Sequence, residues 1–123
     1  MNKNKYSLKE SFEFAFDGFR YALQTQRNLR FQLIVAVIVI TTSTFLPMEL
    51  IEWAIIFLLI SLVIVAEILN TAIEKTIDLI VNHVDSTAKT VKDLSAAAVL
   101  FIALTAVVVG VFIYLPKLIA FFA

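Results

Sequence analysis

Four polar residues recur at helical spacing within a largely apolar stretch of the sequence: Glu67, Asn70, Glu74 and Asp78. Their spacing of i, i+3, i+7 and i+11 places the four side chains on one stripe of an α-helix. A carboxylate near the centre of a bilayer costs about 2.5 kcal/mol or more, so Glu67 must face protein, water or a cation. We therefore take this stripe, called here the carboxylate ladder, as the candidate site. The alternative is a polar network that only joins helices.

A second polar cluster opens the next apolar stretch. It consists of Asp85, Lys89, Lys92 and Asp93. Carboxylate oxygens bind Mg²⁺, and lysines neutralise phosphate oxygens. An acidic ladder facing a basic cluster therefore suits a divalent cation together with a polyphosphate, and Glu67 suits a general base toward a hydroxyl that arrives from the lipid.

The remaining residue types restrict how a phosphate is bound. The chain has no cysteine, which excludes disulfides and thiolate metal sites. Its two glycines, Gly18 and Gly110, cannot form a Gly-rich phosphate-binding loop. Any phosphate must therefore be held by side chains or by a metal ion.

The composition places the ladder in a membrane. Of the 123 residues, 61% are hydrophobic and 16% are charged, whereas soluble domains are about 45–50% apolar. Ten basic and ten acidic residues balance, so we expect no nucleic-acid partner. The length predicts a single membrane-embedded domain over residues 1–123.

Four helices are expected to position the ladder, in an all-α membrane protein. Apolar residues recur every three or four positions from Leu8, which predicts an amphipathic surface helix over about residues 7–25. Three apolar stretches predict transmembrane helices at about 31–46, 53–78 and 92–115. The first is short and is weakened by Gln32, and it stops at Pro47, while Pro116 marks the end of the third.

The basic residues indicate how the chain crosses the membrane. All but one of the ten lie before the first span or around the second connection: Lys3, Lys5, Lys9, Arg20, Arg27, Arg30, Lys75, Lys89 and Lys92. The exception is Lys117. Because cytoplasmic connections are rich in Lys and Arg, we expect a cytoplasmic N-terminus and a C-terminus on the outside. The ladder then opens toward the side that holds ATP.

Two motifs resemble those of a known family, the small prokaryotic-type diacylglycerol kinases and undecaprenol kinases. They are EILNTAIE from Glu67 to Glu74, followed by Asp78, and AKTVKDLSAAAV from Ala88 to Val99. The resemblance covers nearly the whole chain. It implies a homotrimer of three-span subunits in the inner membrane of a bacterium, with active sites shared between neighbours. It also implies Mg²⁺-dependent transfer of the ATP γ-phosphate to a lipid hydroxyl.

The resemblance gives the ladder residues separate roles. It implies that Glu67 is the general base, that Asn70 is a positioning amide in catalysis and that Glu74 binds the metal. The family's nucleotide-binding positions match Glu74, Asp78, Lys92 and Asp93. These roles agree with the residue types, because phosphoryl transfer depends mainly on positioning and charge neutralisation.

One position departs from the family's pattern. Just before Arg27 and Asn28 the family has a metal-binding glutamate, and this chain has Gln26. An amide oxygen can still bind a cation but contributes no charge, so metal affinity should fall. Gln26 therefore motivates an alternative, a catalytically impaired member that acts as a binding scaffold.

The resemblance favours undecaprenol as the lipid, with undecaprenyl phosphate as the product. The preference comes from Ile51-Glu52-Trp53 and from the stretch FIYLPKL between Phe112 and Leu118. Diacylglycerol, giving phosphatidic acid, is the alternative substrate. A different class of function, a small channel or transporter that uses Glu67 as a cation site, is the third possibility.

Overall fold

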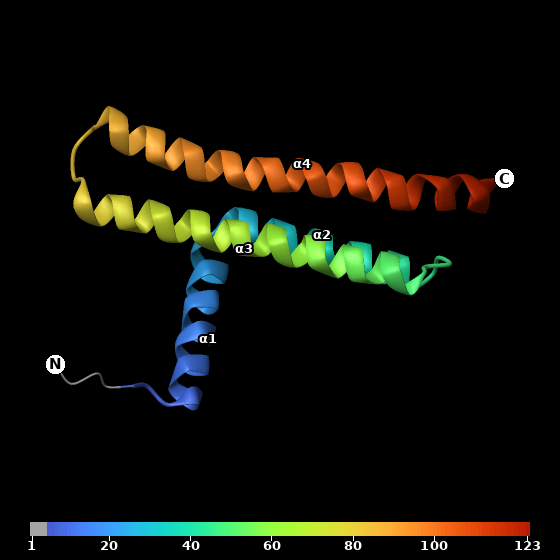
Figure 1. Cartoon of the computed structure of the whole chain (residues 1–123), viewed down its shortest axis with the longest axis horizontal. Helices are drawn as coiled ribbons and strands as arrows, with labels where there is room; N and C mark the ends of the chain where they lie inside the picture. Colours follow the sequence, from blue (N-terminus) through green and yellow to red (C-terminus); the bar gives the residue numbers. More distant parts are fainter. Residues whose placement is uncertain (1–4) are drawn as a thin grey trace.

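The computed structural model describes residues 5–123, and Lys3 of the basic set lies outside that range. Over the described residues the chain forms four α-helices: α1 (Leu8–Thr25), α2 (Arg27–Ser43), α3 (Leu50–Ile80) and α4 (Ser86–Phe122). The helices α2, α3 and α4 lie side by side, and α1 projects sideways from them (Figure 1). The all-α expectation is confirmed for this part of the chain.

The amphipathic helix α1 begins at a capping box. The hydroxyl of Ser7 accepts from the Glu10 backbone N–H at 3.2 Å, and Glu10 accepts from the Ser7 backbone N–H at 2.7 Å. This backbone bond, followed by the bond to the Ser7 hydroxyl, holds the pKa of the Glu10 carboxyl below its ordinary value. Phe12 and Phe16 on its apolar face are 60% and 69% exposed. The helix therefore presents an unpaired apolar face, as expected for a surface helix.

A sharp elbow at Gln26 separates α1 from α2. Gln26 has extended backbone angles, with φ −106° and ψ 106°, so neither helix continues through it. Arg30 stabilises the elbow because its Nη1 donates to the carbonyls of Leu23 and Gln24, at 2.8 and 3.0 Å, at the end of α1. Leu29 is fully buried inside the corner. The elbow sets the direction in which α1 leaves the bundle.

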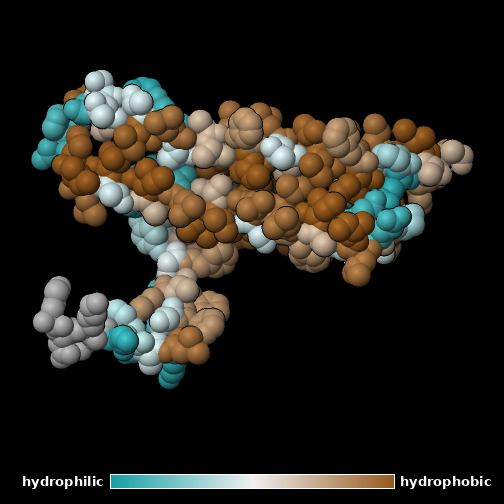
Figure 2. Space-filling model, viewed as in Figure 1, coloured by the Kyte–Doolittle hydropathy of each residue, from teal (hydrophilic) through white to brown (hydrophobic). Residues whose placement is uncertain are grey.

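The two long helices α3 and α4 form an antiparallel hairpin. Their connection ends at Asp85, whose side chain accepts from the Ala88 backbone N–H at 2.8 Å and so caps α4. α2 packs against the first part of α3. Apolar side chains cover the visible middle of the bundle, and hydrophilic residues gather at its two ends (Figure 2).

Two helices have the length and composition needed to cross a membrane. These are α3, with 31 residues, and α4, with 37 residues. The helix α2 has 17 residues, which is at the lower limit of length for crossing about 30 Å of hydrocarbon. It ends at Ser43, earlier than the expected position 46.

The helix α4 does not end at Pro116, as the sequence suggested. It continues to Phe122 with Pro116 inside it. A proline removes one backbone hydrogen bond of a helix, and the remaining backbone bonds keep a long helix continuous because each would be costly to break in an apolar environment. The helix therefore extends past the expected end of the span near 115, and the bounds of the span itself stay a prediction.

Polar contacts fasten the end of the bundle that lies away from the ladder. Nζ of Lys117 contacts the Pro47 carbonyl and Oε2 of Glu52, each at 2.9 Å. A hydrogen bond also joins the hydroxyls of Ser43 and Tyr114. These contacts connect the α2–α3 turn to the last part of α4. The carboxylate ladder runs toward the other end of the α3–α4 hairpin, where the two helices are connected.

Candidate active site

Glu67 is the most enclosed charged residue of the described chain. Its side chain faces α2, where Nε2 of Gln32 donates to Glu67 Oε2 at 3.3 Å, and the residue is 2% exposed. The next turn is also buried, because Thr71 is 6% exposed and its hydroxyl bonds back to the Glu67 carbonyl at 3.0 Å. Only one oxygen of the carboxylate is used by Gln32, so the other is free to accept a proton.

Asn70 and Glu74 form the middle of the ladder. Nδ2 of Asn70 donates to Glu74 Oε1 at 3.3 Å, and both residues are half-buried. The other side of the Asn70 amide faces α4, where the hydroxyl of Ser95 donates to Asn70 Oδ1 at 2.5 Å. A continuous chain of hydrogen bonds therefore runs from α4 through Asn70 to the Glu74 carboxylate.

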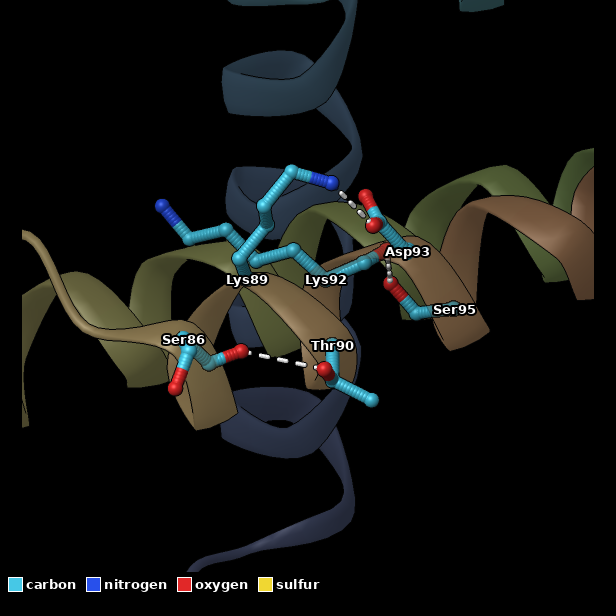
Figure 3. A network of polar contacts seen from close by, with 6 residues as sticks. All are labelled: Ser86, Lys89, Thr90, Lys92, Asp93 and Ser95. Carbon is cyan, nitrogen blue, oxygen red and sulfur yellow. Dashed lines mark hydrogen bonds and ion pairs between the residues drawn. The ribbon is translucent and has the colours of Figure 1, made fainter.

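Two ion pairs lie beyond Glu74, at the hydrophilic end of the hairpin. Lys92 Nζ lies 2.5 Å from Asp78 Oδ1 and so joins α4 to α3. Lys89 Nζ lies 2.5 Å from Asp93 Oδ2 on the exposed surface of α4 (Figure 3). Asp93 is thus paired within its own helix and does not contact the ladder.

Two cavities adjoin the ladder, and they differ in chemistry. An open cavity of about 640 Å³ is lined by the α3–α4 connection and by the helix ends beside it. Its lining includes Asp78, His83, Lys89 and Lys92. A second cavity of about 380 Å³ lies among α2, α3 and α4 and is lined almost entirely by apolar side chains. Gln32 is the polar residue at the end of this second cavity that is nearest to Glu67.

The helix α1 crosses α3 at the level of the ladder. Lys75 Nζ lies 5.6 Å from the centre of the Tyr21 ring, a cation–π contact between the two helices. The contact places the last part of α1 beside the turn of α3 that contains Glu74 and Lys75.

Gln26, the other predicted metal ligand, lies at the elbow between α1 and α2. Its Nε2 donates to Thr25 Oγ1 at 3.3 Å. Across residues 5–123, no three His, Asp or Glu side chains gather closely enough to hold a metal ion.

The structure adds two residues that the sequence did not single out. In the sequence Gln32 is a polar residue that weakens a predicted span, and Ser95 is one position of the Ala88–Val99 motif. Both side chains contact the ladder directly. A polar residue within an apolar run was the available signal in each case, but the contacts depend on how neighbouring helices are rotated.

Comparisons with known proteins identify the family to which this sequence is similar. A family model described as prokaryotic diacylglycerol kinase matches residues 13–114 of the chain. This match includes α2, α3, the ladder, and α4 as far as Tyr114. It therefore covers every residue of the candidate site.

Three relatives extend the comparison to individual proteins. A diacylglycerol kinase of Synechocystis is 42% identical over 93% of this chain and 66% of its own length. An undecaprenol kinase of Bacillus subtilis is 40% identical over 89% of each chain. A diacylglycerol kinase of Helicobacter pylori is 30% identical over 74% of this chain and 71% of its own length. The relatives therefore include kinases of two different lipids.

Proposed function

Because the chain belongs to the prokaryotic diacylglycerol kinase family, we propose that it phosphorylates the hydroxyl of a membrane lipid with ATP. The observation that carries the proposal is the ladder itself. A buried carboxylate, an oriented amide and a second carboxylate follow one another toward the Lys92–Asp78 pair. Positioning and charge neutralisation are the main requirements of phosphoryl transfer, and these side chains supply both.

Glu67 is the proposed general base. Gln32 holds one carboxylate oxygen, and the other accepts the proton of the lipid hydroxyl as the hydroxyl oxygen bonds to the γ-phosphorus. The bond between that phosphorus and the β–γ bridging oxygen breaks, and ADP leaves. The burial of Glu67 keeps water away from the carboxylate, so hydrolysis of ATP is disfavoured.

Lys92, Asp78 and Asp93 are the proposed nucleotide-binding residues. Lys92 is partly exposed and is paired with Asp78, and such surface pairs contribute only about 0–1 kcal/mol. Phosphate oxygens can therefore replace Asp78 as the partner of Lys92 at little cost. Asp93 is paired with Lys89 on the exposed surface of α4.

The side chains also fit Mg²⁺, with Glu74 as the proposed carboxylate ligand. Mg²⁺ in such sites is usually held by one or two carboxylates together with substrate phosphates and water, so a three-carboxylate cluster is not needed. When bound, the ion neutralises charge on the phosphates. Gln26 is the second proposed ligand, and its amide oxygen adds no negative charge.

The proposed assembly is a homotrimer in the inner membrane of a bacterium. We propose that α2, α3 and α4 all cross the membrane, with the N-terminus in the cytoplasm and the C-terminus outside. The basic residues near the ladder support this orientation. We propose that the active sites are shared between neighbouring subunits, as the family resemblance implies, and the lack of a cluster of three His, Asp or Glu side chains within residues 5–123 of one chain supports this.

Undecaprenol is the proposed lipid, and diacylglycerol is the alternative. The Bacillus subtilis relative carries the first name and the Synechocystis relative the second, at nearly equal identity. The apolar cavity beside Gln32 suits either kind of hydrocarbon chain, so the choice rests on the resemblance of the 51–53 and 112–118 stretches.

The test is a transfer assay on the full-length protein in nanodiscs. Labelled ATP and Mg²⁺ are supplied with undecaprenol or with diacylglycerol, and Glu67→Gln serves as the inactive control. Labelled undecaprenyl phosphate supports the proposal, and labelled phosphatidic acid alone assigns the other lipid. No labelled lipid from wild type, with product from Gln26→Glu, identifies the impaired scaffold that Gln26 suggests.

A further inference from the structure

We propose that Ser95 is a positioning residue that holds the Asn70 amide in its working orientation. The inference rests on the proposed function, since it assigns Asn70 to phosphoryl transfer. The Ser95 hydroxyl lies 2.5 Å from Asn70 Oδ1, and Ser95 is 8% exposed. The bond connects the first turns of α4 to the middle of α3, so it depends on the packing of the hairpin.

The orientation of an asparagine side chain is decided by what surrounds its two ends. An amide presents an acceptor oxygen at one end and two donor hydrogens at the other. Here Ser95 supplies a hydrogen to the oxygen, and Glu74 accepts one from the nitrogen at 3.3 Å. In the reversed orientation the amide oxygen would face the Glu74 carboxylate, and two acceptors would lie together. Ser95 and Glu74 therefore select the same orientation from opposite sides.

This orientation leaves one hydrogen of Asn70 Nδ2 without a partner from the ladder. Glu74 uses the other hydrogen, and the oxygen is occupied by Ser95. A free N–H beside the carboxylates is the group that can donate to an oxygen of the transferring phosphoryl group. Preorganised donors of this kind act without reorganising during the reaction.

A packing role is the competing explanation for Ser95. Its hydroxyl also lies 3.0 Å from the Lys92 carbonyl of its own helix, a contact that would satisfy it without Asn70. A hydroxyl has one hydrogen to donate, and the Asn70 oxygen lies nearer than the Lys92 carbonyl. The two explanations differ in what removal of the hydroxyl does to turnover.

The kinetic test compares Ser95→Ala with Ser95→Thr in the nanodisc assay. We expect Ser95→Ala to lower kcat about fivefold, the factor that corresponds to one neutral hydrogen bond, with KM for ATP and lipid within about twofold. Ser95→Thr keeps the hydroxyl and should recover most of kcat. In an Asn70→Ala background, Ser95→Ala should have little further effect, because it acts through Asn70.

Ser43→Ala is the matched control. Ser43 is also a buried serine, and its hydroxyl bonds to Tyr114 of a different helix at the far end of the bundle. We expect it to lower thermal stability and leave kcat unchanged. Wild-type kcat in Ser95→Ala would overturn the inference while the proposed function stands. Equal losses of kcat in Ser95→Ala and Ser43→Ala would also overturn it.

A second measurement does not depend on turnover. In protein labelled with ¹⁵N-asparagine, Asn70→Asp identifies the Asn70 side-chain amide signals. We expect Ser95→Ala to shift these signals and speed their exchange with water, and Ser43→Ala to leave them in place. Unchanged signals in Ser95→Ala would overturn the positioning role. If wild type phosphorylates no lipid but the signals move, the proposed function fails and the contact stands.

Discussion

Gln32 of α2 donates its amide hydrogen to the buried carboxylate of Glu67 on α3, over 3.3 Å. This bond joins the two helices at the level where the ladder begins. Because Glu67 is 2% exposed, water cannot readily replace a lost donor. The Gln32–Glu67 bond therefore contributes both to the packing of α2 on α3 and to the position of the carboxylate that is the proposed base.

Replacing Gln32 by leucine should destabilise the protein and slow transfer. The substitution keeps most of the volume but leaves the Glu67 carboxylate without its donor, which costs about 1–3 kcal/mol. Thermal unfolding in detergent measures the loss. Gln24→Leu, at an exposed glutamine of α1, is the matched control and should be near wild type. Equal stability of the two variants would contradict an important role for the Gln32 bond.

Glu67→Gln should reduce turnover by about 100-fold or more, since a general base typically contributes that factor, and Glu74→Gln should also abolish most turnover, because it removes the proposed carboxylate ligand of Mg²⁺. The amide keeps the shape of the side chain and removes the charge. Glu13→Gln, on the exposed face of α1, serves as the control. Transfer rates close to wild type in either ladder variant would remove that residue from its proposed role.

Gln26→Glu should increase apparent Mg²⁺ affinity. Gln26 precedes the first residue of α2, where a negative charge is favourable both for the helix and for a nearby cation. We expect the Mg²⁺ concentration at half-maximal rate to fall by about threefold or more, as one added charge contact is worth about 1 kcal/mol. Gln24→Glu adds the same charge two positions earlier and tests whether the gain in apparent Mg²⁺ affinity depends on the position of the charge.

Lys92→Met should raise KM for ATP about tenfold or more, because a charge-assisted hydrogen bond to phosphate contributes about 1.5–3 kcal/mol. The loss of the exposed Asp78 pair should barely affect stability. Lys9→Met removes a comparable surface pair on α1 and should leave KM unaltered. An ATP titration of initial rates distinguishes the two variants.

Lys117→Met should lower stability without changing the catalytic constants. Nζ of Lys117 holds both the Pro47 carbonyl and Glu52, and its side chain is only 14% exposed. The substitution removes the donor to the Pro47 carbonyl and the ion pair with Glu52, whose Oε2 still accepts from the Glu49 backbone N–H, and the lost donor costs about 1–3 kcal/mol. Unchanged thermal unfolding would show that the contacts at this end of the bundle contribute little. A changed KM would show that they act on the distant site.

The sequence by itself determined the helical class and placed the proposed site residues on one stripe of a helix. Helical periodicity from Leu8 predicted α1 to within one residue, because burial of an apolar face dominates the energetics of such a helix. The spacing of Glu67, Asn70 and Glu74 likewise predicted a shared stripe. These are local properties of one helix, so no tertiary information was needed.

Only the tertiary structure decided which residue of a neighbouring helix each side chain of the carboxylate ladder contacts. Glu67 faces Gln32 on α2, whereas Asn70 and Asp78 face Ser95 and Lys92 on α4. The reason is that partner choice depends on the rotation and crossing of separate helices, which the spacing within one helix does not specify. The continuation of α4 past Pro116 was also visible only in the structure, where helical turns on both sides of the proline keep the helix continuous.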